Sequence, residues 1–245
     1  KTERWQAADE EMRGRVVAAS KRLLVTETEE PEKAKDESLD RIRHGYMQAV
    51  WLLLDVDPAW LTAQPDQWWQ RWSWYCLREL HPHLSGEDDA PKRLLLQMLM
   101  THSGNEVTTA LRDLARASDS ASSSLLSGIL DIGLNIEQPT LSQTLSDLMV
   151  AGAISVASIG VVARFILKRD TERALRTCYL QLQGSSAPDS DAVSVTAAVA
   201  LLTEAPGDSW TQVRNHLQNR PDLASRILGE YAQTERFRGR SAEDS

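Results

Sequence analysis

The chain has 245 residues, of which 42% are hydrophobic and 25% are charged, and its formal net charge is −8. This is the composition of an ordinary globular protein that is long enough to bury a sizeable core. The acidic balance argues against a nucleic acid as partner, because domains that bind nucleic acids usually present a basic face.

Membrane insertion and disulfide bonding are also disfavoured. The stretch from Leu148 to Ala163 carries no charge, but it is shorter than the roughly 20 residues that a membrane-spanning helix needs. The two cysteines, Cys76 and Cys178, lie far apart in helical patterns, and we expect them to be reduced thiols in a cytoplasmic protein. Because the chain starts with Lys1 and not with Met, we interpret it as part of a longer protein.

The first part of the chain predicts helices separated by a charged connector. Residues 1–26 form a predicted N-terminal helix, since apolar side chains recur there at helical spacing: Trp5, Met12, Val16, Ala19 and Leu23. Residues 27–38 are charged and interrupted by Pro31, and they predict an exposed loop.

Residues 39–89 predict a helical segment that is rich in tryptophan. A helix expected from Ser38 to Leu54 has a stripe of residues predicted to be buried: Ile42, Met47, Val50 and Leu54. Asp57 and Pro58 have the chemistry of a helix start, with a carboxylate cap before a proline at the first position. Pro65 and Asp66 open the next predicted helix, which runs to about Leu80.

From residue 90 to residue 237 the chain predicts pairs of amphipathic helices that recur roughly every 30 to 40 residues. Ser103 to Glu106 and Thr140 to Gln143 match the capping box of a helix start. The first helix of each pair is the more apolar, which predicts one row of helices facing the interior and one facing water. Residues 238–245 predict a flexible polar tail.

On these repeated helix pairs the chain resembles the HEAT-like and armadillo-like α-solenoids. The resemblance implies an all-α fold, a solenoid of irregular antiparallel helix hairpins with about 11–12 helices. More loosely, the chain resembles the C-terminal helical-repeat part of bacterial NACHT-type signalling NTPases, in which such an array is the sensor. No phosphate-binding loop motif occurs in the chain, so this resemblance implies no catalytic residue here.

The tryptophans are the sharpest local feature of the sequence, and most of them fall between Trp51 and Trp74. Trp69, Trp72 and Cys76 share one helix face. The main expectation is that the clustered indoles fill the junction between the N-terminal helices and the repeat array, each N–H finding a carbonyl. The alternative is that some bind a partner, because tryptophan is enriched at interaction hot spots. The candidates for this partner-binding role are Trp60, Trp68 and Trp74.

Other groups could carry chemistry but form no recognisable motif. His81 and His83, with Asp88 and Asp89 nearby, could ligate a metal, but Pro82 breaks the helix between the histidines and we expect a polar loop. His44, His102 and His216 are scattered, and we expect them at surfaces or helix caps. Residues 118–124 predict a serine-rich turn without the motif of a serine nucleophile.

The sequence therefore favours a non-catalytic interaction module that binds a protein or peptide, or that holds neighbouring domains in place. It predicts no catalytic residue, no metal site and no cofactor. Two alternatives stay open: a regulatory sensor arm of a larger bacterial signalling or defence NTPase, and a HEAT-like DNA-processing enzyme, which the acidic charge disfavours.

Overall fold

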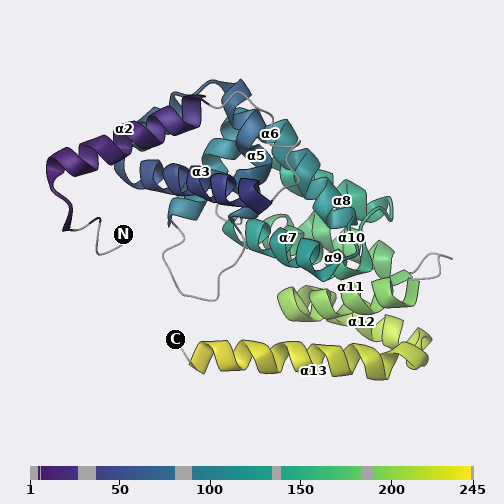
Figure 1. Ribbon diagram of the computed structural model, residues 1–245. Helices are drawn as coiled ribbons and strands as arrows, with labels where there is room; N and C mark the ends of the chain where they lie inside the picture. Colours follow the sequence, from purple (N-terminus) through teal and green to yellow (C-terminus); the bar gives the residue numbers. More distant parts are fainter. Residues whose placement is uncertain are drawn as a thin grey trace. The chain divides into compact units, whose positions relative to one another are not determined.

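The computed structural model of the chain describes residues 5, 7–26, 37–80, 90–133, 139–183 and 190–243 (Figure 1). Over these residues the regular secondary structure is helix alone, in twelve helices, which confirms the all-α class. Within that described part, no helix is both long and apolar enough to cross a membrane. The chain divides into two compact units, Lys1–Val107 and Thr108–Ser245, and each is described here by itself.

The first unit holds four complete helices and the first part of a fifth. Their bounds are α2 (Glu10–Thr26), α3 (Glu37–Val56), α4 (Pro58–Thr62), α5 (Asp66–Arg78) and α6 (Ala90–Arg116). The second unit begins within α6, so the division falls later in the chain than the predicted start of the repeats at residue 90.

Helix α2 begins later than the predicted helix over residues 1–26. The Asp9 carboxylate accepts a hydrogen bond from the backbone N–H of Met12 at 2.7 Å, so Asp9 is the cap and Glu10 the first helical residue. Among the α2 side chains that the structure describes, Leu24 alone is buried, whereas the apolar side chains of Met12, Val16 and Leu23 are exposed. The apolar stripe that marks this helix in the sequence is thus not its packed face.

The burial of α3 and the start of α4 agree closely with the sequence predictions. Met47, Val50 and Leu54 are buried, as predicted, while the side chain of Ile42 lies outside the described residues. The Asp57 carboxylate accepts from the backbone N–H of Trp60 at 3.2 Å, which confirms the predicted helix start. Asp57 also pairs with Lys21 of α2, and that hydrogen bond lowers the pKa of the Asp57 carboxyl below its ordinary value.

Aromatic rings on α5 fill the core of the first unit. Trp69, Trp72 and Cys76 are buried on one face, as the sequence predicts. The Trp72 ring lies 5.1 Å from that of Tyr46 on α3, and the Trp69 ring meets Trp68 edge to face at 5.0 Å. Burial raises the pKa of the Cys76 thiol to about 12, which keeps it protonated and unreactive.

Helix α6 is kinked at the place where the sequence predicts a break. Ser103 has non-helical dihedral angles, φ −141° and ψ 38°, and the helix continues on both sides of it. The predicted capping box is only half right, because the Ser103 hydroxyl donates backwards to the carbonyl oxygen of Leu99 at 2.9 Å.

The second unit continues from the end of α6 with seven helices within the described residues. These are α7 (Ser120–Gly133), α8 (Pro139–Val150), α9 (Val156–Arg169), α10 (Thr171–Gln183), α11 (Ser190–Glu204), α12 (Pro206–Asn219) and α13 (Pro221–Glu243). Helix α9 packs against α7 and α11, and α11 also packs against α13. Helix α10 packs against α8 and α12, so the helices form two rows, and consecutive helices from α8 to α13 pack across them (Figure 1).

Small side chains bring α9 and α11 close together at the centre of the second unit. A Cβ atom at Gly160 of α9 would lie only 3.2 Å from Cγ2 of Thr196 on α11. Most of α11 is buried: Ser194, Val195, Ala197, Ala198, Ala200, Leu201, Leu202 and Thr203. This row is therefore the interior of the unit, as the more apolar first helix of each pair predicts.

Three local predictions in the second unit need correction. The predicted serine-rich turn over residues 118–124 is largely helix, because the Asp119 carboxylate accepts from the Ser122 backbone N–H at 2.8 Å and α7 begins at Ser120. The second predicted helix start lies inside a helix, because α8 begins at Pro139, before Thr140, and the Gln143 amide donates forward to Asp147 at 2.6 Å. The predicted flexible tail over residues 238–245 is helical as far as Glu243.

The buried indole at position 69 should dominate the stability of the first unit. We expect Trp69→Ala to lower the free energy of unfolding by about 3–5 kcal/mol, because it leaves a cavity in a packed core. Denaturation in urea, followed by tryptophan fluorescence, measures this unit selectively, since Trp210 is the only tryptophan beyond residue 107.

The matched control is Trp74→Ala, because Trp74 lies on the same helix with 41% of its surface exposed. We expect Trp74→Ala to lower the free energy of unfolding by less than about 1 kcal/mol. Equal losses in the two variants would contradict the assignment of Trp69 to the core.

Candidate functional site

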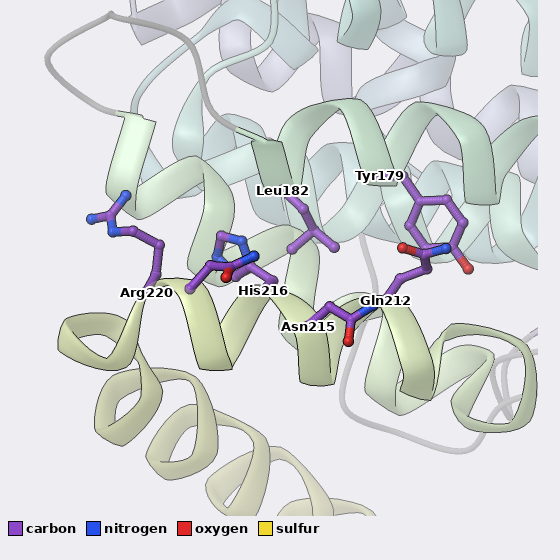
Figure 2. Close-up of a pocket in the computed structure, with 7 residues that line it drawn as sticks. Tyr179, Leu182, Gln212, Asn215, His216 and Arg220 are labelled. Atoms are coloured by element: carbon purple, nitrogen blue, oxygen red, sulfur yellow. The ribbon is translucent and has the colours of Figure 1, made fainter.

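A polar cavity of about 350 Å³ lies between α10 and α12 (Figure 2). Tyr179 and Leu182 line it from α10, and the remaining lining residues come from α12 and the position after it: Gln212, Asn215, His216, Asn219 and Arg220. These residues are brought together by the packing of two helices that are separated in the sequence by α11.

The α12 side of the cavity is a polar stripe on one helix face. Gln212, Asn215, His216 and Asn219 follow the spacing i, i+3, i+4, i+7, which places side chains above one another on an α-helix. Apolar residues usually occupy this spacing, and here Ser209 and Val213 supply the buried face of α12 instead. The stripe offers amide and imidazole groups, which donate and accept hydrogen bonds.

Hydrogen bonds from the interior of the unit hold His216 in place. The Ser194 hydroxyl on α11 lies 3.2 Å from the carbonyl oxygen of Leu182 and 2.9 Å from Nε2 of His216. A carbonyl oxygen can only accept, so the single hydroxyl proton goes to Leu182 and Nε2 of His216 must donate to the serine oxygen. This arrangement does not activate Ser194 as a nucleophile, since its proton points away from the imidazole and its side chain is buried.

Arg220 closes one end of the cavity and joins two helix starts. Its guanidinium donates to Asp191 in the first turn of α11 at 2.9 Å and to Asp222 in the first turn of α13 at 2.7 Å. The bond to Asp222, and then the bond to Asp191, raise the pKa of Arg220, while Arg220 lowers the pKa of Asp222. Two carboxylates thus balance this cation, and the cavity wall carries no excess positive charge.

The environment of His216 disfavours its protonated form. Partial burial is the main cause that lowers the pKa of His216 below 6.5, and the nearby charge of Arg220 adds to it. The charge of Asp222 raises the pKa of His216, but this effect is smaller than the other two. At neutral pH the imidazole is therefore neutral, with Nε2 committed to Ser194.

A second groove, of about 400 Å³, lies between α8 and α10. Its charged side chains are paired within α10 and its cap: Arg173 lies 3.7 Å from Asp170, and Arg176 lies 2.7 Å from Glu172. Val150 of α8 and Leu180 of α10 also line this groove, and each is more than half exposed, at 54% and 52%.

The three helices α8, α10 and α12 each carry one exposed apolar side chain at regular intervals in the sequence. Val150 and Leu180 flank the second groove, and Trp210 on α12 is 50% exposed. Side chains of α10 donate hydrogen bonds to the backbone of both neighbouring helices: the Gln181 side-chain amide to the Met149 carbonyl of α8 at 2.7 Å, and the Tyr179 hydroxyl to the Asp208 carbonyl of α12 at 3.1 Å.

The three tryptophans predicted as partner anchors lie in the first unit. The Trp68 indole N–H donates to the carbonyl oxygen of Leu24 at 3.0 Å, and the ammonium of Lys21 lies 5.7 Å from the centre of the Trp60 ring. Both tryptophans are half-buried and hold α2 in place, whereas Trp74 is exposed and stays a candidate anchor.

The other candidate groups take mostly structural positions. The His102 ring stacks on Trp69 at 5.6 Å, and its Nδ1 lies 2.8 Å from the Asp66 carboxylate. His81, His83, Asp88 and Asp89 fall outside the described residues, and within the described ones no three potential ligands are grouped as a metal site would require. Cys178 is buried, which raises the pKa of its thiol to about 12.

Sequence reasoning missed the residues of the α10/α12 cavity. It treated His216 as an isolated surface or cap residue, and it did not single out Trp210. One signal was available, because the polar stripe on α12 has the spacing that normally marks a buried apolar face. The pairing of that stripe with Tyr179 and Leu182 depends on helix packing, which the sequence does not display.

Comparisons of the chain with protein-family models, with characterised proteins and with solved structures find no match.

The lowered pKa of His216 predicts a specific pH dependence of stability. As the pH falls below about 6.5, the unfolded chain takes up a proton at this side chain before the folded chain does, so the free energy of unfolding decreases. The free energy of unfolding begins to decrease near the ordinary histidine pKa, and it stops decreasing below the lowered pKa of His216. Urea denaturation of the wild type and of His216→Gln, between about pH 8 and pH 5, should show an acid-side loss that only the wild type carries.

Arg220→Gln supplies the control for the cause of this shift. Removing the guanidinium abolishes one repulsive charge and exposes His216 to the full attraction of Asp222, so the pKa of His216 should rise towards 6.5 or beyond. NMR titration of the imidazole protons measures it directly. A wild-type His216 that titrates at or above 6.5 would contradict the described environment.

Proposed function

We propose that the second unit is a non-catalytic interaction module that binds an extended segment of a protein partner across α8, α10 and α12. The observation that carries the proposal is the regular placement of Val150, Leu180 and Trp210, one exposed apolar side chain on each helix of this row. Exposed apolar groups that recur along a surface are typical of binding sites.

The polar groups of the α10/α12 cavity fit a peptide backbone. Gln212, Asn215 and Asn219 offer both donors and acceptors along one helix face, and a peptide unit presents one of each. A helical rise of about 1.5 Å per residue separates Gln212 from Asn219 by about 10 Å, which is the length of roughly three extended residues. Such contacts position a bound segment, while the apolar anchors supply most of its affinity.

The electrostatics favour a ligand without a strong charge. In the α8/α10 groove both arginines face carboxylates of α10 or its cap, and in the α10/α12 cavity Arg220 faces Asp191 and Asp222. Neither surface offers the unbalanced positive charge that a nucleic acid requires. This balance supports a protein or peptide partner over the DNA-processing alternative.

We further propose that the two helix rows are a HEAT-like solenoid, in keeping with the resemblance found in the sequence. The support is the alternation of a buried row, α7, α9 and α11, with the row that carries the grooves. In such an architecture the buried row fixes the spacing of the outer helices, and the outer helices are free to vary in side-chain chemistry.

A library of random linear peptides displayed on phage tests the proposal. Peptides selected on the wild-type chain should bind at least ten times more weakly to Leu180→Asp and to Trp210→Ala, because truncation of a central anchor costs about 1.4 kcal/mol or more. Binding is measured by fluorescence anisotropy with the synthetic peptides.

Leu228→Asp is the matched control, because Leu228 is 48% exposed on α13, in the other row. It should leave the affinity unchanged. The proposal fails if no peptide is enriched, or if Leu180→Asp and Trp210→Ala bind the selected peptides as tightly as Leu228→Asp does.

A further inference from the structure

The imidazole of His216 carries a hydrogen-bond acceptor that the fold does not use. Its Nε2 donates to the Ser194 hydroxyl on α11, so the proton of the neutral ring lies on Nε2 and Nδ1 keeps a lone pair. The two nitrogens point to opposite sides of the ring, and Nδ1 is therefore directed away from Ser194. Within the part of the chain that the structure describes, no group hydrogen-bonds Nδ1, and the ring lines the α10/α12 cavity (Figure 2).

Side-chain amides flank this acceptor along the same face of α12. Gln212 lies four residues before His216 and Asn219 lies three residues after it, which places one amide about a turn to each side of the ring. Asn215 adds a third amide to the cavity wall. Among the described residues, none of the three is engaged through its side chain in a hydrogen bond. A ligand that donates to Nδ1 therefore meets further donors and acceptors beside it.

The charges at the end of the cavity select an uncharged ligand. The Arg220 guanidinium pairs with Asp191 and Asp222, so it offers no unbalanced charge to an anion. A carboxylate also has no hydrogen to donate, and its lone pairs would face the lone pair of Nδ1. An ammonium would lose hydration without gaining a carboxylate, because both carboxylates already pair with Arg220.

A carboxamide meets each of these conditions. Its NH₂ group can donate to Nδ1 of His216, while its carbonyl oxygen accepts from an amide of Gln212 or Asn219. Both bonds use groups that carry no net charge, so neither requires the desolvation of an ion.

We propose that the α10/α12 cavity binds an asparagine or glutamine side chain of the segment held across α8, α10 and α12, and that Nδ1 of His216 accepts a hydrogen bond from this carboxamide. The inference rests on the proposed function, because it names the group that the same surface recognises. The apolar anchors supply the affinity, and His216 supplies the selectivity, since a buried acceptor left without its donor costs more than the bond gains.

Peptides selected on the wild-type chain test the proposal. They should carry asparagine or glutamine at one fixed distance from their apolar residues. Replacing that residue by aspartate or glutamate of the same shape removes the donor, and it should weaken binding at least about tenfold. Fluorescence anisotropy with the synthetic peptides measures the ratio.

Variants of His216 separate its two nitrogens. In His216→Gln the new amide reaches the position of Nε2 and can donate to Ser194, but nothing replaces Nδ1, so the carboxamide peptide should bind at least about fivefold more weakly. His216→Asn keeps an oxygen acceptor near the position of Nδ1 and should retain more of the affinity. Gln218→Ala is the matched control, because Gln218 is exposed on α12 outside the cavity, and it should bind as the wild type does.

The pH dependence of binding is an independent readout. Protonation of His216 places a hydrogen on Nδ1, so affinity should be constant above about pH 7 and fall as the pH drops through the lowered pKa of His216. Tyr179, from α10, stays neutral over this range because burial raises its pKa. Arg220 and its partners Asp191 of α11 and Asp222 of α13 stay charged as a hydrogen-bonded group. The acid-side loss should disappear in His216→Gln.

The failure of this inference differs from the failure of the proposed function. The inference is overturned if selected peptides depend on Leu180 and Trp210 but bind equally well with glutamate in place of glutamine, or if His216→Gln binds them as tightly as the wild type or as His216→Asn. If no peptide is enriched, the proposed function fails. NMR of the imidazole nitrogens, with N-acetylglutamine methylamide as probe, then decides the carboxamide site alone: a saturable shift of Nδ1 that N-acetylglutamate methylamide does not cause supports it, and no shift overturns it.

Discussion

Helix α11 contacts α9, α10, α12 and α13, and it can do so because its side chains are mostly small. Alanines at positions 197, 198 and 200 allow neighbouring backbones to approach, and the 3.2 Å distance expected between a Cβ at Gly160 and Thr196 shows how tightly α9 fits. Burial of α11 excludes water from the interior of the second unit and contributes to its hydrophobic stabilisation. The spacing of the outer helices follows from it.

Residues of the α10/α12 cavity are held in place by hydrogen bonds to that core. Ser194 lies on the buried helix α11 and is hydrogen-bonded to His216. At the end of the same cavity, Arg220 donates to Asp191 at the start of α11 and to Asp222 at the start of α13. Groups that bind a ligand are most effective when their positions are fixed before it arrives. The α10/α12 cavity therefore combines exposed polar side chains with supports that reach into the core.

The first unit distributes its apolar residues differently. Indoles and aliphatic groups on α5 fill its core, while α2 is held by a few directed contacts: the Trp68 indole on the Leu24 carbonyl and Lys21 on Asp57. Those contacts leave the most regular apolar stripe of α2 outside.

Residue patterns in the sequence were sufficient to predict where most helices lie. They were insufficient to predict the hydrogen bonds at several helix starts and which face of a helix is buried. Asp57 and Pro58 start α4 as expected, because both act within one turn. The Ser103 hydroxyl donates to the Leu99 carbonyl, a local side-chain-to-backbone bond that the capping-box pattern does not predict, and Thr140 lies inside α8 and not before it. The stripe on α2 identified a helix correctly but could not reveal which face the rest of the unit covers.

The candidate sites were beyond sequence reasoning for a different reason. Ser194 and His216 lie on different helices, and only the packing of α11 against α12 brings the hydroxyl to 2.9 Å from the ring. Periodicity predicts the faces of single helices, whereas a binding site is a property of two faces at once.

Amide hydrogen exchange, measured along the chain by mass spectrometry, tests the central claim that the buried helix α11 is the centre of the second unit and supports α12, which is largely exposed. Amides of α11 should exchange slowest within the second unit, and those of α12 measurably faster, because α12 opens with less loss of buried contacts. Equal exchange in the two helices, or faster exchange in α11 than in α12, would contradict it.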